Sequence, residues 1–115
     1  MSEAMKQRFH PEMSAVTIDM LMHALSEPVR LNILLILDKR GLTACADVYA
    51  ALRIGKTNAS HHFRILRENG LIRATMIGRD LHTQIRHQEL EAKFPGLVGM
   101  VLGAWREERT PEPGA

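Results

Sequence analysis

A run of polar side chains between positions 56 and 64 contains the residue types that bind nucleic acid. An asparagine can make two hydrogen bonds to an adenine edge, and an arginine can fork onto guanine or onto a phosphate. Lysine and hydroxyl side chains bind phosphate oxygens. We expect contacts to double-stranded DNA from Lys56, Thr57, Asn58, Ser60, His61 and Arg64. The alternative is that these residues are only the solvated side of an amphipathic helix.

A second basic element stands at positions 78–80, where Gly-Arg-Asp has the composition of a tight turn. Residues on both sides of it alternate between apolar and polar, which is the pattern of a β-hairpin. Arg79 at the tip is therefore expected to contact the minor groove or the DNA backbone, with Asp80 orienting it. The choice between a DNA contact and a solvated strand residue stays open for Arg73, His82 and Arg86.

The charge distribution favours a surface that binds polyanions. The whole chain has a net charge of only +2, but its segment from 53 to 86 holds seven basic and two acidic residues. That segment therefore carries +5 and the rest of the chain carries −3. A basic region on a slightly acidic body suits nucleic-acid binding, although a solvated arginine-rich surface would have the same composition.

A small set of helices and one hairpin must position these residues. Apolar residues recur at helical spacing in five stretches, with capping residues such as Ser26, Thr43 and Gly70 at their ends. Pro95 is expected as the first residue of the last helix, and residues 87–93 as a connector. The predicted elements are helices over 14–25, 27–40, 44–52, 56–69 and 95–108, and hairpin strands over 72–77 and 81–85.

The order of these elements favours one mainly α domain with a small β-hairpin. Two short helices joined by a tight turn and followed at once by a basic hairpin form a winged helix-turn-helix layout. The 115 residues suit a single domain, which we place at 13–109. Residues 1–12 are polar and residues 110–115 are rich in proline, so we expect mobile tails at both ends.

Four strings in this chain resemble the ArsR-type family of bacterial repressors. They are LSEPVRL at 25–31, NASHHFRILRENGLI at 58–72, GR at 78–79 and FPGL at 94–97. The resemblance implies a homodimer, formed by the first and last helices, that binds a near-palindromic operator. It also implies that a bound metal ion or another signal releases the DNA.

The last predicted helix is apolar and contains Gly99 and Gly103, which are four residues apart and allow close helix packing. We expect this helix to pair with a second copy of the chain, together with the first helix. The predicted dimer-interface residues are Met20, Leu21, Leu97, Val98, Val101, Leu102 and Trp105.

The residue types give little support for a metal sensor. Thiolate-binding members of the family carry a Cys-x-Cys pair, but the matching positions here are Ala44 and Ala46, on either side of the only cysteine, Cys45. Zinc-sensing members use acids and histidines on the last helix, and none occurs from 95 to 105. We predict no metal site, no cofactor and a buried, inert Cys45. A redox-active thiol, a disulfide between two copies and a metal site assembled from scattered residues stay open as alternatives.

Two further groups of residues could serve a signal. His61 and His62 are adjacent on a helix and point about 100° apart, so they are poorly placed to hold one metal ion; we expect His62 to be partly buried packing. A small-molecule effector could occupy a soft apolar pocket on the interface elements, although ordinary packing is the simpler interpretation. The methionines concerned are Met13, Met20, Met22 and Met100.

The sequence thus favours a sequence-specific transcriptional regulator, a homodimeric repressor released by an unidentified signal. The alternative is a winged-helix module that binds an acidic protein partner without DNA specificity. An enzyme is not expected, since the Gly55-Lys56-Thr57 string lacks the upstream glycine of a phosphate loop, which is Ala50 here. The lack of a long apolar run or a signal peptide, and the single cysteine, predict a cytoplasmic protein with no membrane partner.

Overall fold

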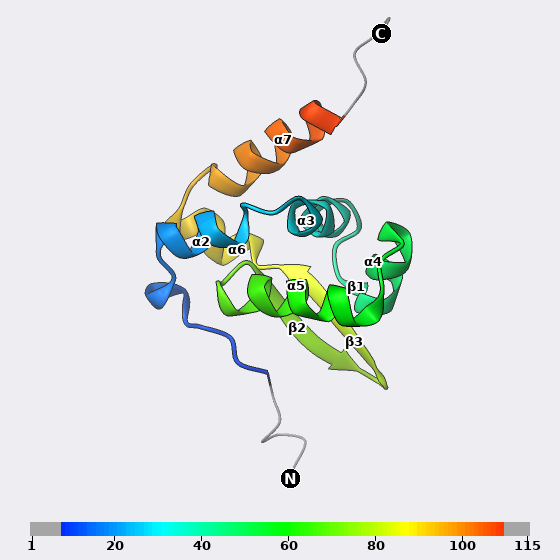
Figure 1. The fold of residues 1–115 in the computed structure, drawn as a ribbon. Coiled ribbons are helices and arrows are strands. Elements are labelled where there is room, and N and C mark those ends of the chain that lie inside the picture. The colour runs from blue at the N-terminus through cyan, green and yellow to red at the C-terminus, as the bar shows by residue number, and fades with distance from the viewer. Residues whose placement is uncertain (1–7, 110–115) are drawn as a thin grey trace, which may run out of the picture.

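A computed structural model of the chain describes residues 8–109, which form helices packed around a small antiparallel sheet (Figure 1). In chain order the elements are η1 (Met13–Ala15), α2 (Ile18–Ala24), α3 (Pro28–Arg40), β1 (Thr43–Ala44), α4 (Cys45–Leu52), α5 (Lys56–Glu68), β2 (Ile72–Ile77), β3 (Asp80–Ile85), α6 (His87–Lys93) and α7 (Leu97–Arg109). This order confirms the predicted mainly α fold, with β2 and β3 as the hairpin. Residues 1–7 and 110–115, which belong to the expected tails, lie outside the described residues.

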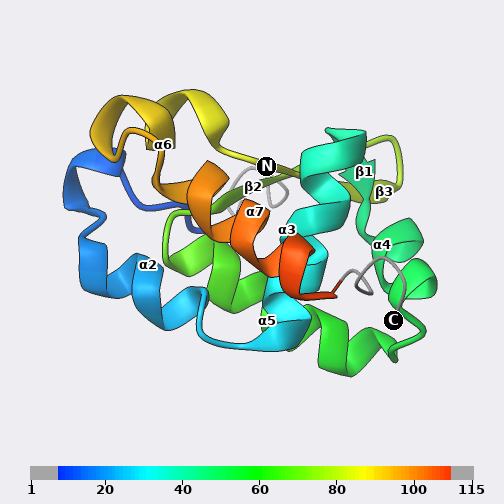
Figure 2. The ribbon, with the colours of Figure 1, turned by 90° about the horizontal axis from the view of Figure 1, so that it is seen from above.

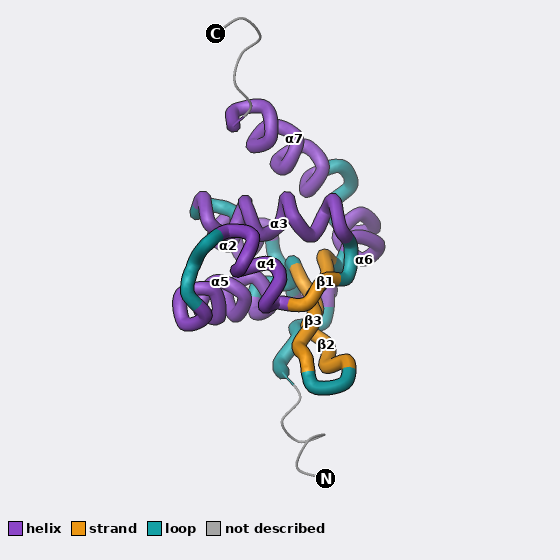
Figure 3. Tube along the Cα trace, turned by 90° about the vertical axis from the view of Figure 1, so that its right-hand side faces the viewer, coloured by secondary structure: helices purple, strands orange, loops and turns teal. Residues whose placement is uncertain are grey.

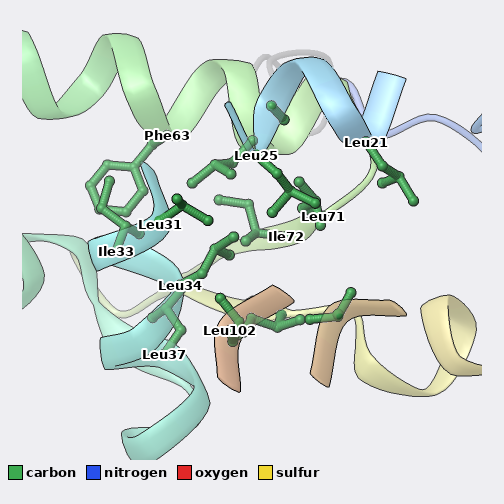
Figure 4. Packing of buried hydrophobic residues seen from close by; sticks show 14 of the residues in the cluster. Leu21, Leu25, Leu31, Ile33, Leu34, Leu37, Phe63, Leu71, Ile72 and Leu102 are labelled. Carbon is green, nitrogen blue, oxygen red and sulfur yellow. The ribbon is translucent and has the colours of Figure 1, made fainter. Parts of the chain in front are cut away.

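The centre of the core is α3, because its apolar side chains point in nearly every direction. Ile33 and Leu34 are fully buried and Leu37 is almost so. Figure 4 shows α3 side chains between Phe63 of α5 and Leu102 of α7. Since a fully buried leucine or isoleucine stabilises the fold by about 1.5–3 kcal/mol, α3 fixes where α5 and α7 lie.

The sheet has the strand order β1-β3-β2, and both pairings are antiparallel. Thr83 of β3 lies opposite Ala74 of β2 and opposite Thr43 of β1. The prediction that Thr43 caps a helix is wrong: its hydroxyl donates to the carbonyl of Gly41 at 2.8 Å, and Ala44 is the N-cap of α4. The backbone of β1 pairs with a strand from a distant part of the chain, a contact that local sequence does not reveal.

Two predicted helix starts near the N-terminus are also corrected. The first helix is interrupted between η1 and α2, because Val16 is extended there and turns a fully buried side chain into the core. The N-cap of α3 is Glu27, not Ser26. The carboxylate of Glu27 accepts hydrogen bonds from the backbone N–H groups of Val29 at 2.7 Å and Arg30 at 3.2 Å, and its negative charge also suits a helix N-terminus.

The C-terminal part contains one helix more than predicted. The expected connector, residues 87–93, is α6, and α7 begins at Leu97 rather than at Pro95. Gly96 has a φ of 77°, and its N–H donates to both carboxylate oxygens of Glu91 at 3.2 and 3.1 Å. This turn separates α6 from α7. Figure 2 shows α7 lying across α3, and Figure 3 shows it at the opposite end of the molecule from the hairpin.

Residues 8–11, which we name the N-terminal strap, are not the mobile tail that the sequence predicts. The carbonyl of Phe9 accepts a hydrogen bond from Arg67 Nε at 3.1 Å, and His10 Nε2 accepts one from the backbone N–H of Ala74 at 2.9 Å. The carbonyl of Pro11 accepts a third from Arg86 Nη1 at 2.9 Å. Polar composition suggested mobility, but these partners come from α5, from β2 and from the residue that follows β3, and they hold the strap to the domain.

Within residues 8–109, no single helix is long and apolar enough to cross a membrane. Only α2 and α3 taken together reach such a length and composition, and they are bent by 99° relative to each other. Much of the apolar surface of α3 is buried in the core, and a buried core helix commonly has this composition.

Candidate nucleic-acid interface

A tight turn between α4 and α5 leaves the start of α5 facing solvent. Arg53 has a φ of 58°, in the left-handed region, and this bend ends α4. Gly55 is the N-cap of α5, and its carbonyl accepts a hydrogen bond from the N–H of Ala59 at 2.9 Å. Lys56 and Thr57 in the first turn are exposed. The unpaired N–H groups of this turn therefore give the helix end a positive potential.

The two sides of α5 differ sharply in burial. Its apolar side is seated in the core through Ala59, Phe63 and Leu66. The α5 residues expected to contact DNA are all exposed: Lys56, Thr57, Asn58, Ser60, His61 and Arg64. Arg79 is exposed as well, in the turn between β2 and β3. The structure leaves every predicted DNA-contact side chain open to solvent.

The leading half of α5 and the tip of the hairpin are neighbours in space. Lys56 and Ser60 of α5 and Arg79 of the hairpin border one open cavity of about 420 Å³. Figures 1 and 3 show α5 and the hairpin on the side of the molecule away from α7. A projecting helix end flanked by a basic ribbon is an arrangement that fits a DNA groove.

Two of the three residues left open by the sequence serve the fold. Arg86 is buried, and its guanidinium donates to both carboxylate oxygens of Glu89 at 2.8 and 3.0 Å. Arg73 Nη2 donates to the same carboxylate at 3.0 Å. Hydrogen bonds from Arg86 first, and then from Arg73, lower the pKa of Glu89 from 4.5 to about 2. The third residue, His82, is half-buried, with Nδ1 3.2 Å from the carbonyl oxygen of Asp80.

The accessible charge of the basic segment is therefore smaller than its composition suggests. The basic residues of 53–86 that are exposed are Arg53, Lys56, Arg64 and Arg79. Sequence reasoning counted Arg53 in the charge of this segment but did not include it among the DNA contacts. The sequence predicted the tight turn between the two helices, and the structure shows that Arg53 in this turn is exposed.

A buried polar network positions α5 from the side of the helix that faces the core. Arg30 of α3 is buried, and its guanidinium donates to the carbonyl of Ala24 at 2.7 Å and to the carbonyl of His23 at 3.2 Å. These two hydrogen bonds cap the C-terminal end of α2. Its Nη1 lies 3.2 Å from Nδ1 of His62, which is buried on α5. Burial lowers the pKa of His62, so the ring stays neutral and accepts this hydrogen bond at neutral pH. His62 packs and orients, as predicted, rather than facing a ligand.

Cys45 lies at the start of α4 and is buried. Burial raises the pKa of its thiol to about 11, although the nearby charges of Arg8 and Arg67 act in the opposite direction. The thiol is therefore protonated at neutral pH and a weak nucleophile. Within residues 8–109, His, Cys, Asp and Glu side chains form no group of three that could hold a metal ion.

The predicted dimer-interface residues fall into two groups. Leu21, Val98 and Leu102 are buried in the core of their own subunit, which leaves them little surface for a partner. The half-buried members are Met20, Leu97, Val101 and Trp105. Three apolar residues of α2 and α7 that are outside that prediction are more exposed than its members. Ile18 is 50% exposed, Met22 is 42% exposed and Met100 is 68% exposed. Helical spacing identified the apolar helices but not which apolar side faces outward.

Known proteins resemble this chain in sequence. A family profile described as a helix-turn-helix domain matches residues 25–74. A homologue of the transcriptional repressor SmtB from Synechocystis is 34% identical over 59 residues, which are 51% of this chain and 44% of that relative. The uncharacterised HTH-type transcriptional regulator YceK from Bacillus subtilis is 34% identical over 76 residues, which are 65% of this chain and 76% of YceK. The chain belongs to the ArsR-type family of winged helix-turn-helix regulators.

Solved structures resemble the fold of this ArsR-type regulator. The homodimeric winged helix-turn-helix DNA-binding domain of Mb0332 from Mycobacterium bovis, a possible ArsR-family regulator, has a TM-score of 0.62 at 24% identity, covering 90% of this chain and 97% of that one. At that identity the likeness shows the fold. The relatives in sequence are a homologue of a transcriptional repressor and an HTH-type transcriptional regulator, so at the level of the family this chain is a DNA-binding transcriptional regulator. The match spans less than half of the SmtB homologue, 44%.

Proposed function

We propose that this ArsR-type regulator binds an operator as a homodimer and represses transcription until a signal releases it. The observation that carries the proposal is the exposure of all seven predicted contact residues on α5 and the hairpin. Lys56, Thr57 and Asn58 lie in the first turn of α5, where the potential of the helix end is positive, and the opposite side of the same helix is buried in the core. Binding to a bacterial operator would take place in the cytoplasm.

Each contact residue has a role that follows from its chemistry and its place on α5. Asn58 and Arg64 would read base edges in the major groove. Lys56, Thr57 and Ser60 would bind phosphate oxygens close to the start of the helix. His61 would face the groove: its Nδ1 lies 3.4 Å from Arg64 Nη2, so the two side chains can act together. Arg79 would enter the minor groove or bind the backbone.

A homodimer would present two such helices to one DNA duplex. The exposed apolar residues of α2 and α7 offer the surface for it, namely Ile18, Met22 and Met100, beside the half-buried Leu97 and Val101. The Mb0332 domain, which has the same fold, is homodimeric, and this supports the proposal. Two recognition helices related by a two-fold axis would contact half-sites about 34–36 Å apart.

Selection of bound sequences from a random DNA pool tests the proposal directly. We expect a two-fold repeat in the selected sequences and binding that weakens steeply as salt is raised. A lack of any mobility shift at low salt would overturn the proposal and would favour the alternative function, a module that binds an acidic protein partner.

Two arginine variants separate specific contact from general charge. Arg64→Ala should weaken binding to the selected operator by about 1–3 kcal/mol and relax the preference at one base position. Arg40→Ala removes the same charge from an exposed site in the last turn of α3, outside α5 and the hairpin, and should leave that preference unchanged. Equal effects of the two variants would remove Arg64 from the base-reading contacts.

A further inference from the structure

The open cavity beside the predicted DNA contacts has the size and walls of a small-molecule site. It lies where α4, the start of α5 and the hairpin come together (Figure 1). Its volume of about 420 Å³ falls in the range of roughly 300–1,000 Å³ that is usual for ligand pockets. Tyr49 of α4, Phe63 of α5 and Leu81 of β3 give it apolar and aromatic walls.

The part of the cavity lining that comes from the start of α4 is apolar. Cys45 lines it between Ala44 and Ala46, and burial raises the pKa of the Cys45 thiol to about 11. A protonated, buried thiol behaves as a small apolar group. This part of the lining therefore suits a hydrocarbon body.

The rim of the cavity is cationic. Its basic residues are Arg8, Lys56, Arg67 and Arg79, against one carboxylate, that of Asp80. Arg67 is fixed in place because its Nε donates to the carbonyl of Phe9 in the N-terminal strap. Burial lowers the pKa of Arg67, the carboxylate of Glu68 at 3.9 Å from Arg67 Nη2 acts in the opposite direction, and the like charges of Arg8 and Arg64 lower the pKa further. The four cations of the lining thus face only the carboxylates of Asp80 and Glu68, so an anion would stabilise this arrangement.

We propose that this cavity binds a small organic acid with an apolar body and that the bound acid is the signal that releases DNA. The carboxylate lies among the arginines, and the apolar body packs on Phe63 and Tyr49. The inference rests on the proposed function, because Lys56, Ser60 and Arg79 line the cavity and are also predicted DNA contacts. Ligand and DNA backbone use the same cations, so each weakens the binding of the other by the same factor.

This site differs from the effector pocket that the methionines suggested. Met22 and Met100 are exposed on α2 and α7, whereas the cavity is formed by α4, α5, the hairpin and the strap. The strap matters because it supplies Arg8. Its anchoring through Phe9 and His10 holds that cation at the rim, so the strap is part of the site.

Titration of the full chain with 2-naphthoate, followed by calorimetry, tests the site without any DNA. The matched probes are 2-naphthamide, which lacks the charge, and inorganic phosphate, which lacks the apolar body. We expect saturable 2-naphthoate binding at one site per chain, with both other probes weaker by about tenfold or more. Lack of saturable 2-naphthoate binding at millimolar concentration, or equal binding of the amide, would overturn the proposal.

Two variants locate the bound probe. Arg8→Gln removes a rim charge, and Ala46→Trp fills the cavity from α4; each should weaken 2-naphthoate binding by about tenfold or more. Ala50→Trp is the matched control, since Ala50 is exposed on the same helix and is not part of the cavity lining. Circular dichroism of each variant would check that it is folded. Full binding by folded Ala46→Trp would place the probe elsewhere and overturn the proposal.

A competition experiment separates this inference from the proposed function. 2-Naphthoate should release the selected operator from the wild-type chain but not from Ala46→Trp. Naphthoate binding without any DNA binding would contradict the proposed function and leave the site intact. DNA binding that saturating naphthoate does not weaken would contradict the release mechanism alone.

Discussion

The indole N–H of Trp105 in α7 donates a hydrogen bond to the side-chain carbonyl of Asn32 in α3 at 2.9 Å. The guanidinium of Arg109 lies 5.6 Å from the centre of the same ring. Trp105, predicted at the dimer interface, therefore makes its polar contact inside its own subunit. This contact fixes how α7 lies on α3 and thereby which side of α7 faces outward.

Asn32→Ala should lower the free energy of unfolding by about 1 kcal/mol, because the partly buried indole N–H then lacks its partner. Trp105 is the only tryptophan, so its fluorescence during urea unfolding reports the change. An unfolding midpoint equal to that of the wild type would show that this hydrogen bond does not stabilise α7 on α3.

Met100→Glu should weaken self-association by about tenfold or more, since dimer formation would bury an unpaired carboxylate. Met100 is 68% exposed, so the folded subunit should tolerate the change. Met76→Glu is the matched control, because Met76 is 51% exposed on the hairpin, far from α7. Sedimentation equilibrium measures both. A dimer of unchanged affinity in Met100→Glu would place the interface on another surface.

Gly70→Ala should destabilise the fold by about 2–4 kcal/mol, as the sum of a left-handed backbone and a steric clash. Gly70 has a φ of 88°, and an added Cβ would lie 2.5 Å from Cγ2 of the buried Val16. Gly78→Ala is the control: its φ is 64°, but a Cβ there meets nothing within 4 Å. This variant should lose only the free energy that the left-handed backbone costs, about 1–2 kcal/mol. Equal losses in urea unfolding would show that Val16 moves aside at little cost.

Glu89→Gln should lower the free energy of unfolding at neutral pH by about 1–2 kcal/mol. This loss is smaller than the loss from breaking a fully buried ion pair, because the side chain of Glu89 is 43% exposed. The pKa of Glu89 is lowered from 4.5 to about 2 in the folded chain. Its contribution is thus complete above pH 4.5 and is lost as the pH falls toward 2. The difference between wild type and variant should therefore vanish over that range. Thermal melts measure this difference, and Glu108→Gln, which removes an exposed carboxylate from the end of α7, is the matched control.

Thr83→Val should raise the free energy of unfolding by about 1 kcal/mol. The hydroxyl of Thr83 is fully buried in β3 and has no hydrogen-bond partner among residues 8–109. A buried hydroxyl without a partner costs about 1–3 kcal/mol, and valine keeps the branched shape that suits a strand. A less stable variant in thermal melts would show that the hydroxyl is satisfied in solution, for example by water.

Local patterns in the sequence determined the elements that present the candidate site. The apolar stripe of α5 requires the polar residues Lys56, Thr57, Asn58, Ser60, His61 and Arg64 to face the other way, and these six are exposed, whereas His62 is buried. The Gly-Arg-Asp turn likewise predicted the hairpin and the exposed Arg79. These features follow from periodicity and turn chemistry, which act over a few residues and can be read along the chain.

Tertiary contacts decided the rest, because they join residues whose separation in sequence carries no local signal. The two-residue strand at Thr43, the strap held by Arg67 and Arg86, and the cavity that gathers Arg8 near Lys56 all depend on such contacts. So does the removal of Arg86 from the basic surface. The sequence by itself determined which residues could bind DNA; only packing decided which charges remain free to do so.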